Sequence, residues 1–215
     1  MSERWILLGT GGHARVILDC LRALGKDVRG VLDPDERRWG SRFEGVEIAG
    51  GDDRLGSMRD SGITHFALGL GGAPDLDLRR RLFERARETG LEPGTIVHPS
   101  AQVSASARLG QGAQVLHMAV VQAGASVGAN VLVNTGALVE HDCRVGDHSH
   151  IATGAVLAGG VKVGESVFVG AGAVVRNGRT LGRGAVVGMG SVVVHDVAIG
   201  ARVWGNPARD PGASP

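Results

Sequence analysis

The 215-residue chain has little aromatic character and almost no cysteine. It contains no tyrosine, aromatic residues make up 3% of it, and its two cysteines are Cys20 and Cys143. So few rings suit a narrow interior that has no room for aromatic side chains. Two cysteines far apart in the sequence exclude the disulfide framework of a small secreted domain. We expect both thiols to be buried and reduced, which is compatible with the cytoplasm.

Strong net charge and long apolar runs are also lacking. The formal net charge is +1, and no basic stripe is interleaved with aromatics, which makes nucleic acid and anionic membranes poor partners. Residues 1–10 have no basic flank, no adequate apolar core and no cleavage site of a signal peptide. No later run reaches the length of a membrane span. We therefore expect a soluble, cytoplasmic protein.

A six-residue repeat dominates the carboxyl-terminal half of the chain. Aliphatic residues recur at every sixth position from Val97 to Ile199, and a small or β-branched residue follows four places later, except at Arg179. A period of six fits neither a helix nor a flat strand, so the chain must turn once per hexad. Three hexads per coil would stack residues eighteen apart about 4.8 Å from one another. The pattern predicts a parallel β-helix of about six coils, with glycines such as Gly110 and Gly146 supplying the corner backbone angles.

The amino-terminal part alternates strands and helices instead. The pattern predicts strands over residues 5–8, 28–32 and 63–70, and helices over residues 16–24 and 78–89. The basic run from Arg79 to Arg81 is expected on a solvated helix face. We predict a small α/β domain with a parallel sheet over residues 1–93, similar to half of a dinucleotide-binding unit.

The loop after the first predicted strand is rich in glycine. Gly9, Gly11 and Gly12 can bring backbone N–H groups to a phosphate at the following helix amino terminus, where the helix dipole favours an anion. Asp33 ends the second strand, at the distance expected of an acid that meets a nucleotide. The alternative is that these glycines only permit a tight strand-to-helix turn.

Both halves resemble the hexapeptide-repeat acyltransferases that modify nucleotide-linked amino sugars. The hexads resemble the left-handed β-helix of this family, and the loop from Gly9 to His13 resembles its G-x-G-G-H-G loop, with Ala14 in place of the last glycine. The resemblance implies a nucleotide-sugar-binding domain over residues 1–93, an acetyltransferase β-helix over residues 94–209 and a tail over residues 210–215. It places the nucleotide at the residues Gly11, Gly12, His13 and Asp33.

Polar residues concentrate between Asn134 and Gly160. The three hexads of each coil would give the β-helix the shape of a triangular prism. His141 falls in a predicted corner, so its ring can point away from the interior of this prism. His150 precedes an inward aliphatic residue, so its side chain points outward. This segment resembles the catalytic segment of the same family. A sugar amine is mostly an ammonium at neutral pH and must lose a proton before it attacks a thioester, and an imidazole is suited to accept that proton. The resemblance implies that His141 is the general base and that Asp142 orients it.

Further roles follow from the same resemblance. His150 would donate a hydrogen bond to the acetyl carbonyl, Asn134 would lie near the substrate, and the Gly159 N–H would stabilise the developing oxyanion. Lys162 and Arg183 are candidates for contacts with coenzyme A phosphates, and the alternative is that both lie in solvated corners.

The end of the repeat has its own motif. The segment from Val203 to Arg209 resembles the V-x-G-N-P-A-[KR] ending of hexapeptide acetyltransferases. We expect it to cover the open end of the prism, and we expect residues 211–215 to be a disordered tail.

The sequence as a whole predicts an acetyl-coenzyme A dependent N-acetyltransferase. The resemblance to bacillosamine-pathway and perosamine N-acetyltransferases implies transfer to the 4-amino group of a UDP- or GDP-linked sugar, in a homotrimer with active sites between subunits. Three alternatives remain open: a sialic acid O-acetyltransferase, a non-catalytic nucleotide-sugar-binding scaffold, and a hydratase with zinc on His141, His148 and His150. Our prediction includes no metal.

Overall fold

The chain forms two compact units. The structure, a computed structural model, describes residues 3–72 and 76–210. One unit comprises Met1–Gly71 and Leu78–Pro99, and the other comprises Gly72–Asp77 and Ser100–Pro215. The segment Gly72–Asp77 therefore belongs with the second unit, although its sequence has no hexad pattern. No helix within the described ranges is both long enough and apolar enough to cross a membrane.

The first unit is built around a mostly parallel six-stranded sheet of order β3-β4-β2-β1-β5-β6. The pairs β1–β2, β1–β5, β2–β4 and β5–β6 are parallel, and β3–β4 is antiparallel. The strands of this sheet are β1 (Arg4–Leu8), β2 (Asp27–Leu32), β3 (Arg42–Phe43), β4 (Val46–Gly50), β5 (His65–Leu68) and β6 (Glu92–Pro93). The short strand β7 (Ile96–Val97) follows and is not part of this sheet. The helices of this unit are α1 (Gly12–Ala23), α2 (Leu55–Asp60) and α3 (Asp77–Glu88), with single turns η1 (Glu36–Arg38) and η2 (Asp52–Arg54). The predicted α/β class is confirmed, but the sequence pattern missed β3, β4, β6 and α2.

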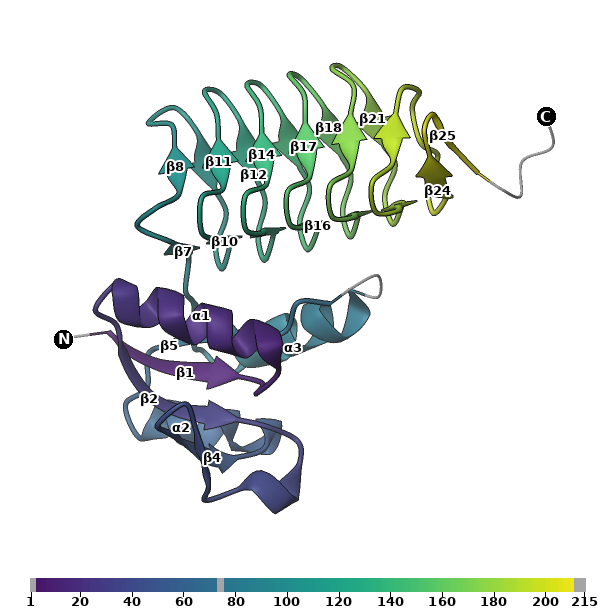
Figure 1. Ribbon diagram of the computed structural model, residues 1–215. Coiled ribbons are helices and arrows are strands. Elements are labelled where there is room, and N and C mark those ends of the chain that lie inside the picture. The colour runs from purple at the N-terminus through teal and green to yellow at the C-terminus, as the bar shows by residue number, and fades with distance from the viewer. Residues whose placement is uncertain (1–2, 73–75, 211–215) are drawn as a thin grey trace. The chain divides into compact units, whose positions relative to one another are not determined.

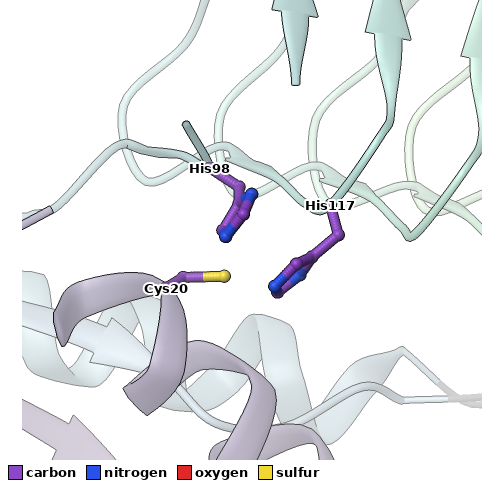
Figure 2. Close-up of side chains that lie close together, drawn as sticks. All are labelled: Cys20, His98 and His117. Atoms are coloured by element: carbon purple, nitrogen blue, oxygen red, sulfur yellow. The ribbon is translucent and has the colours of Figure 1, made fainter. Parts of the chain in front are cut away.

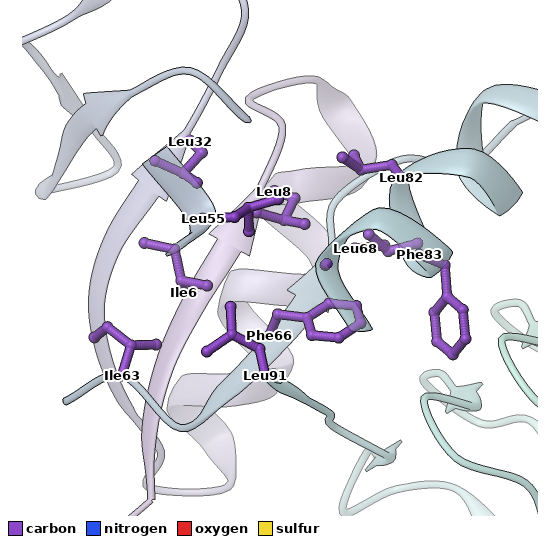
Figure 3. Close-up of a cluster of buried hydrophobic side chains, with 11 residues drawn as sticks. Ile6, Leu8, Leu32, Leu55, Ile63, Phe66, Leu68, Leu82, Phe83 and Leu91 are labelled. Carbon is purple, nitrogen blue, oxygen red and sulfur yellow. The ribbon is translucent and has the colours of Figure 1, made fainter. Parts of the chain in front are cut away.

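A cluster of buried side chains holds this unit together (Figure 3). Ile6 from β1, Phe66 from β5 and Phe83 from α3 belong to it, and the two phenylalanine rings meet edge to face at 5.6 Å. Each such side chain contributes roughly 1.5–3 kcal/mol when fully buried. The cluster fixes the sheet, and therefore the loops at the carboxyl ends of its strands.

The expectation of a solvated arginine run on α3 was wrong for Arg79. This residue is 2% exposed, and its guanidinium donates a hydrogen bond to the Leu70 carbonyl. Residues three and four positions apart share one helix face, so Arg79 lies on the same buried face as Leu82 and Phe83. Burial lowers the pKa of Arg79 to about 9.

The second unit is a left-handed parallel β-helix with three sheets (Figure 1). Val133 lies in register with Val115 below and Ile151 above, and Val121 lies in register with Val139. Paired residues are thus eighteen apart, which confirms three hexads per coil. The first sheet contains β10 (Gln114–Val115), β13 (Leu132–Val133), β16 (His150–Ile151), β19 (Phe168–Val169), β22 (Val186–Val187), β24 (Arg202–Gly205) and β25 (Ala208–Arg209). The second contains β8 (Gln102–Val103), β11 (Val120–Val121), β14 (Leu138–Val139), β17 (Val156–Leu157), β20 (Val174–Val175) and β23 (Val192–Val193), and the third contains β9 (Arg108–Leu109), β12 (Ser126–Val127), β15 (Arg144–Val145), β18 (Lys162–Val163) and β21 (Thr180–Leu181).

Glycine serves two different purposes in the corners. From Leu109 to Val187, the third residue after each inward aliphatic adopts a left-handed backbone, as at Gly136 (φ 66°), and also at the non-glycine residues Asp142 and His148 (both φ 60°). Gly110 and Gly146 directly follow the aliphatic, and their backbones are not left-handed. A Cβ at either glycine would lie 2.5–2.6 Å from the backbone of the next coil. The prediction that these two supply corner backbone angles was wrong, because they are needed for the close stacking of coils.

The repeat shortens in its last coil. Leu181 pairs with Val197 and Val187 pairs with Val203, so both offsets are sixteen rather than eighteen. Ile199 is therefore 74% exposed, and the prediction that inward aliphatics continue in step to Ile199 was wrong. β24 and β25 then form an antiparallel hairpin, and the predicted tail over residues 211–215 lies outside the described residues.

Candidate functional site

The imidazole of His141 projects from a corner of the β-helix. His141 is the second residue after the inward Val139 that ends β14, and its side chain is 64% exposed. Its Nδ1 lies 2.9 Å from Oδ2 of Asp142. Asp142 occupies the left-handed corner position, which aspartate tolerates better than most residues. The structure thus brings the two predicted catalytic side chains together.

The carboxylate affects both the pKa and the tautomer of this ring. The hydrogen bond that His141 donates to Asp142, opposed in part by desolvation, raises the pKa of His141 above its ordinary value, and the charges of Asp142 and Glu140 act in the same direction. A carboxylate accepts hydrogen bonds, so Nδ1 carries the proton and Nε2 keeps a lone pair. Nε2 is the atom that can take a proton from an incoming group.

The ring of His141 lies directly against Gly159 of the next coil. A Cβ at Gly159 would be 2.5 Å from Nε2 of His141. Ala123 occupies the equivalent corner one coil below His141, and Asn177 occupies it one coil above Gly159. This corner position can therefore hold a side chain in other coils. The Gly159 carbonyl accepts from the Gly178 N–H at 3.0 Å, whereas its own N–H donates to no group within residues 3–72 and 76–210. A backbone donor therefore stands unused beside the imidazole.

His150 leaves the prism as predicted, but it is covered and only 4% exposed. Its Nδ1 donates to the Gly72 carbonyl at 2.9 Å, and its Nε2 faces Nδ2 of Asn134 at 3.2 Å. The Thr135 N–H donates to Oδ1 of Asn134, which turns the amide NH₂ toward the histidine. Both ring nitrogens thus have partners in the chain, and Asn134 orients His150.

The cover over His150 comes from Gly72, from Leu76 and from the next coil. Leu76 packs on Ala152 and Phe168, and the Phe168 ring meets His150 edge to face at 5.3 Å. This arrangement depends on a segment outside the repeat, so hexad periodicity gave no indication of it.

Basic side chains line the outer face of the third sheet. Lys162 lies three residues after Gly159, in register with Arg144 below it, and Arg183 lies in the corner after β21. A groove of about 650 Å³ on this sheet is lined by Arg108 and Arg144, among other residues. Neither arginine was singled out from the sequence, although both occupy the outward position of their hexads.

The glycine loop of the first unit leads into an open helix amino terminus. Gly11 caps α1 without any side-chain hydrogen bond, and the first turn contains no acidic residue. A Cβ at Gly11 or Gly12 would meet nothing within 4 Å, so an anion can approach there. Ala14, in place of the last glycine, is fully buried, and a Cβ at Gly69 would lie 2.6 Å from the Ala14 methyl. Gly69 therefore provides the close approach between strand and helix.

Asp33 braces this loop from the end of β2. It is 8% exposed, its carboxylate accepts from the Thr10 hydroxyl and from the Asp35 N–H, and it lies 3.8 Å from the Arg38 guanidinium. His13 is the second residue of α1 and is half-buried. The structure thus gathers the predicted nucleotide residues at one edge of the sheet, and their contacts with a nucleotide stay predictions.

Neither Cys20 nor Cys143 forms a disulfide within the described residues, and both are buried, as expected. Burial raises the pKa of Cys20 to about 11, so this thiol stays protonated. It points from α1 toward His98, with its sulfur within 4.8 Å of a ring nitrogen (Figure 2). Cys143 faces the prism interior, with its sulfur 3.2 Å from the Ala158 carbonyl.

The histidines proposed for zinc do not converge. Among the residues that the structure describes, no group of three close metal-ligand side chains includes His141, His148 or His150. Nδ1 of His148 instead faces Nδ2 of Asn130 at 3.1 Å. The geometry therefore gives no support to the zinc hydratase alternative.

This chain is similar in sequence and structure to known proteins. Residues 4–86 match the family described as PglD N-terminal domain, and residues 124–159 and 142–177 match the bacterial transferase hexapeptide family (six repeats). The solved structure of PerB from Caulobacter crescentus, in complex with CoA and GDP-perosamine, is 38% identical with a TM-score of 0.91 and covers 97% of each chain. The chain belongs to the PglD-type hexapeptide-repeat acetyltransferases.

Other solved structures are also similar to this chain. The acetyltransferase domain of PglB from Neisseria gonorrhoeae, in complex with acetyl coenzyme A, is 35% identical with a TM-score of 0.89 and covers 98% of this chain and 100% of that one. WeeI from Acinetobacter baumannii, at 18% identity and a TM-score of 0.64, shares the fold. No curated protein sequence gives a significant match. The predicted family, fold and acetyl-coenzyme A dependent acetyltransferase activity are confirmed.

Proposed function

We propose that this PglD-type acetyltransferase moves an acetyl group from acetyl-coenzyme A to the 4-amino group of a sugar linked to a nucleoside diphosphate, with His141 as general base. One observation carries the proposal: the exposed His141 ring is held by Asp142 and lies against Gly159, whose N–H has no acceptor in the part of the chain that the structure describes. GDP-perosamine and CoA occupy the PerB structure, and that enzyme has also been solved with one of its histidines replaced.

The geometry suits direct attack on the thioester. Nε2 of His141 accepts a proton from the sugar amine as the nitrogen forms a bond to the acetyl carbon. The Gly159 N–H stabilises the negative oxygen of the tetrahedral intermediate. When the carbon–sulfur bond breaks, the leaving thiolate receives the proton from the imidazolium. The His141–Asp142 hydrogen bond keeps the ring oriented throughout.

The first unit would hold the nucleotide. The open amino terminus of α1, with Gly11 and Gly12, suits the diphosphate. Family resemblance also underlies our proposal of a cytoplasmic homotrimer with active sites between subunits. Light scattering on the eluted protein should then give three times the 22.1 kDa chain mass, whereas a monomer would contradict this assembly.

A thiol-release assay tests the reaction itself. Acetyl-coenzyme A is incubated with a panel of UDP- and GDP-linked 4-amino sugars, and with matched acceptors that carry a hydroxyl in place of the amine. We expect release with at least one amino sugar and only background release with the hydroxyl acceptors. Turnover of the hydroxyl acceptors alone would favour O-acetylation and would refute the proposal.

A further inference from the structure

An exposed tryptophan stands at the carboxyl end of the sheet in the first unit. Trp39 directly follows η1 and is 40% exposed, whereas Trp5 in the same unit is 2% exposed. A single exposed apolar ring is common on protein surfaces. Trp39 differs from such a ring because its position is fixed.

Two contacts fix the indole. Its Nε1–H donates a hydrogen bond to the Asp33 carbonyl at 2.8 Å, which ties it to the residue after β2. A Cβ at Gly51 would lie 3.2 Å from Cζ2 of Trp39, so the ring rests against the backbone that follows β4. The indole thus spans the carboxyl ends of two adjacent parallel strands, and open α/β sheets bind their ligands on this side of the sheet.

The neighbouring residue connects this ring to the glycine loop. The Arg38 guanidinium donates to the Thr10 hydroxyl and lies 3.8 Å from the Asp33 carboxylate. Thr10 lies in the loop between β1 and α1, two residues before Gly12. The exposed ring and the proposed diphosphate site therefore belong to one hydrogen-bonded assembly.

We infer that Trp39 is the stacking platform for the nucleobase of the nucleotide sugar. The inference rests on the proposed function, because it takes the ligand to be a nucleotide sugar. A flat indole offers its π face to a base ring, and such stacking tolerates every base. Because Nε1–H is already engaged with the chain, the contact depends on ring overlap rather than on the hydrogen-bonding edge of the base.

Fluorescence titration with GDP and with UDP tests the contact directly. Both nucleotides should quench the emission of the wild type and of Trp204→Phe, which removes an exposed tryptophan of the other unit. Quenching should be lost in Trp39→Phe. Equal quenching in Trp39→Phe and the wild type would overturn the inference.

Affinity and kinetics supply the second readout. Trp39→Leu should raise the Kd of both nucleotides, measured by calorimetry, by about tenfold, the scale of one lost base–aromatic stack. Trp39→Phe should fall between Trp39→Leu and the wild type. With an accepted nucleotide sugar, KM should rise and kcat at saturation should stay within about twofold of the wild type.

The inference and the proposed function fail separately. Unchanged Kd and KM in a folded Trp39→Leu variant would refute the stacking role of Trp39 but would not contradict the proposed acetyl transfer. If no amino sugar were acetylated, the GDP and UDP titrations would still decide whether Trp39 contacts the base. Circular dichroism melting tests whether each variant is folded. If Trp39→Leu does not fold, Trp39→Phe takes its place in the affinity and kinetic measurements.

Discussion

At the scale of single residues, the mechanism that we propose makes the reactivity of His141 depend on its neighbours Asp142 and Gly159. The aspartate accepts from Nδ1 at 2.9 Å, and Gly159 leaves space for the ring. The sequence was sufficient to single out all three. It did not indicate that His150 is buried, because the Gly72 carbonyl that it contacts is 78 residues away along the chain.

The charge of Asp142 should appear in the pH dependence of the reaction. The base must be neutral to accept a proton, so kcat/KM should rise with pH through the pKa of His141. Asp142 raises that pKa, so its replacement should let the pKa fall back toward the ordinary value. In Asp142→Asn the acidic limb of the kcat/KM profile should therefore move to lower pH. An unmoved limb would show that this carboxylate does not act on the catalytic group.

The contact between Gly159 and the ring gives a second test. The methyl of Gly159→Ala would occupy the position of the imidazole, and the exposed ring would swing away from it. We expect kcat to fall about a hundredfold, the cost of misplacing a reacting group by about 1 Å, with little change in the melting temperature. Ala129→Ser adds an atom at the same hexad position on another edge and should keep full activity. Full activity in Gly159→Ala would contradict the placement of the ring.

At the scale of elements, the coils stack so closely that the position directly after each strand of the third sheet cannot accept a side chain. Glycine stands there at Gly110, Gly128, Gly146, Gly164 and Gly182. At Gly146 a Cβ would lie 2.6 Å from the Gly164 backbone. Periodicity predicted the coils and their register, because each hexad repeats the same local geometry. It did not predict why glycine is needed at this position, since the clash lies between coils rather than within a corner.

Gly146→Ala should therefore destabilise the β-helix. Overpacking of this kind costs about 1–3 kcal/mol, which urea unfolding can measure. Gln122→Ala changes the same hexad position where a side chain is already exposed, and it should alter the unfolding free energy by less than about 0.5 kcal/mol. Equal stability of the two variants would mean that the coils separate more easily than the structure indicates.

At the scale of the whole molecule, two units with different folding patterns lie in one chain. The α/β class and the β-helix were both predictable, because each has a strong local period or a glycine loop. The shortened last coil was not predictable, because Ile199 still falls on the six-residue repeat, whereas Val197 is the residue that packs inward. The burial of Arg79 was also missed, because a run of three arginines is usually a solvated face.

The central claim is that the His141 imidazole takes the proton from the acceptor amine. The most direct measurement compares His141→Asn with the wild type in steady-state turnover of an accepted amino sugar, together with the Kd of coenzyme A by calorimetry. General base catalysis contributes about 10²–10⁴-fold, so kcat should fall by at least a hundredfold while the Kd stays within about twofold. Turnover within about threefold of the wild type would contradict the claim.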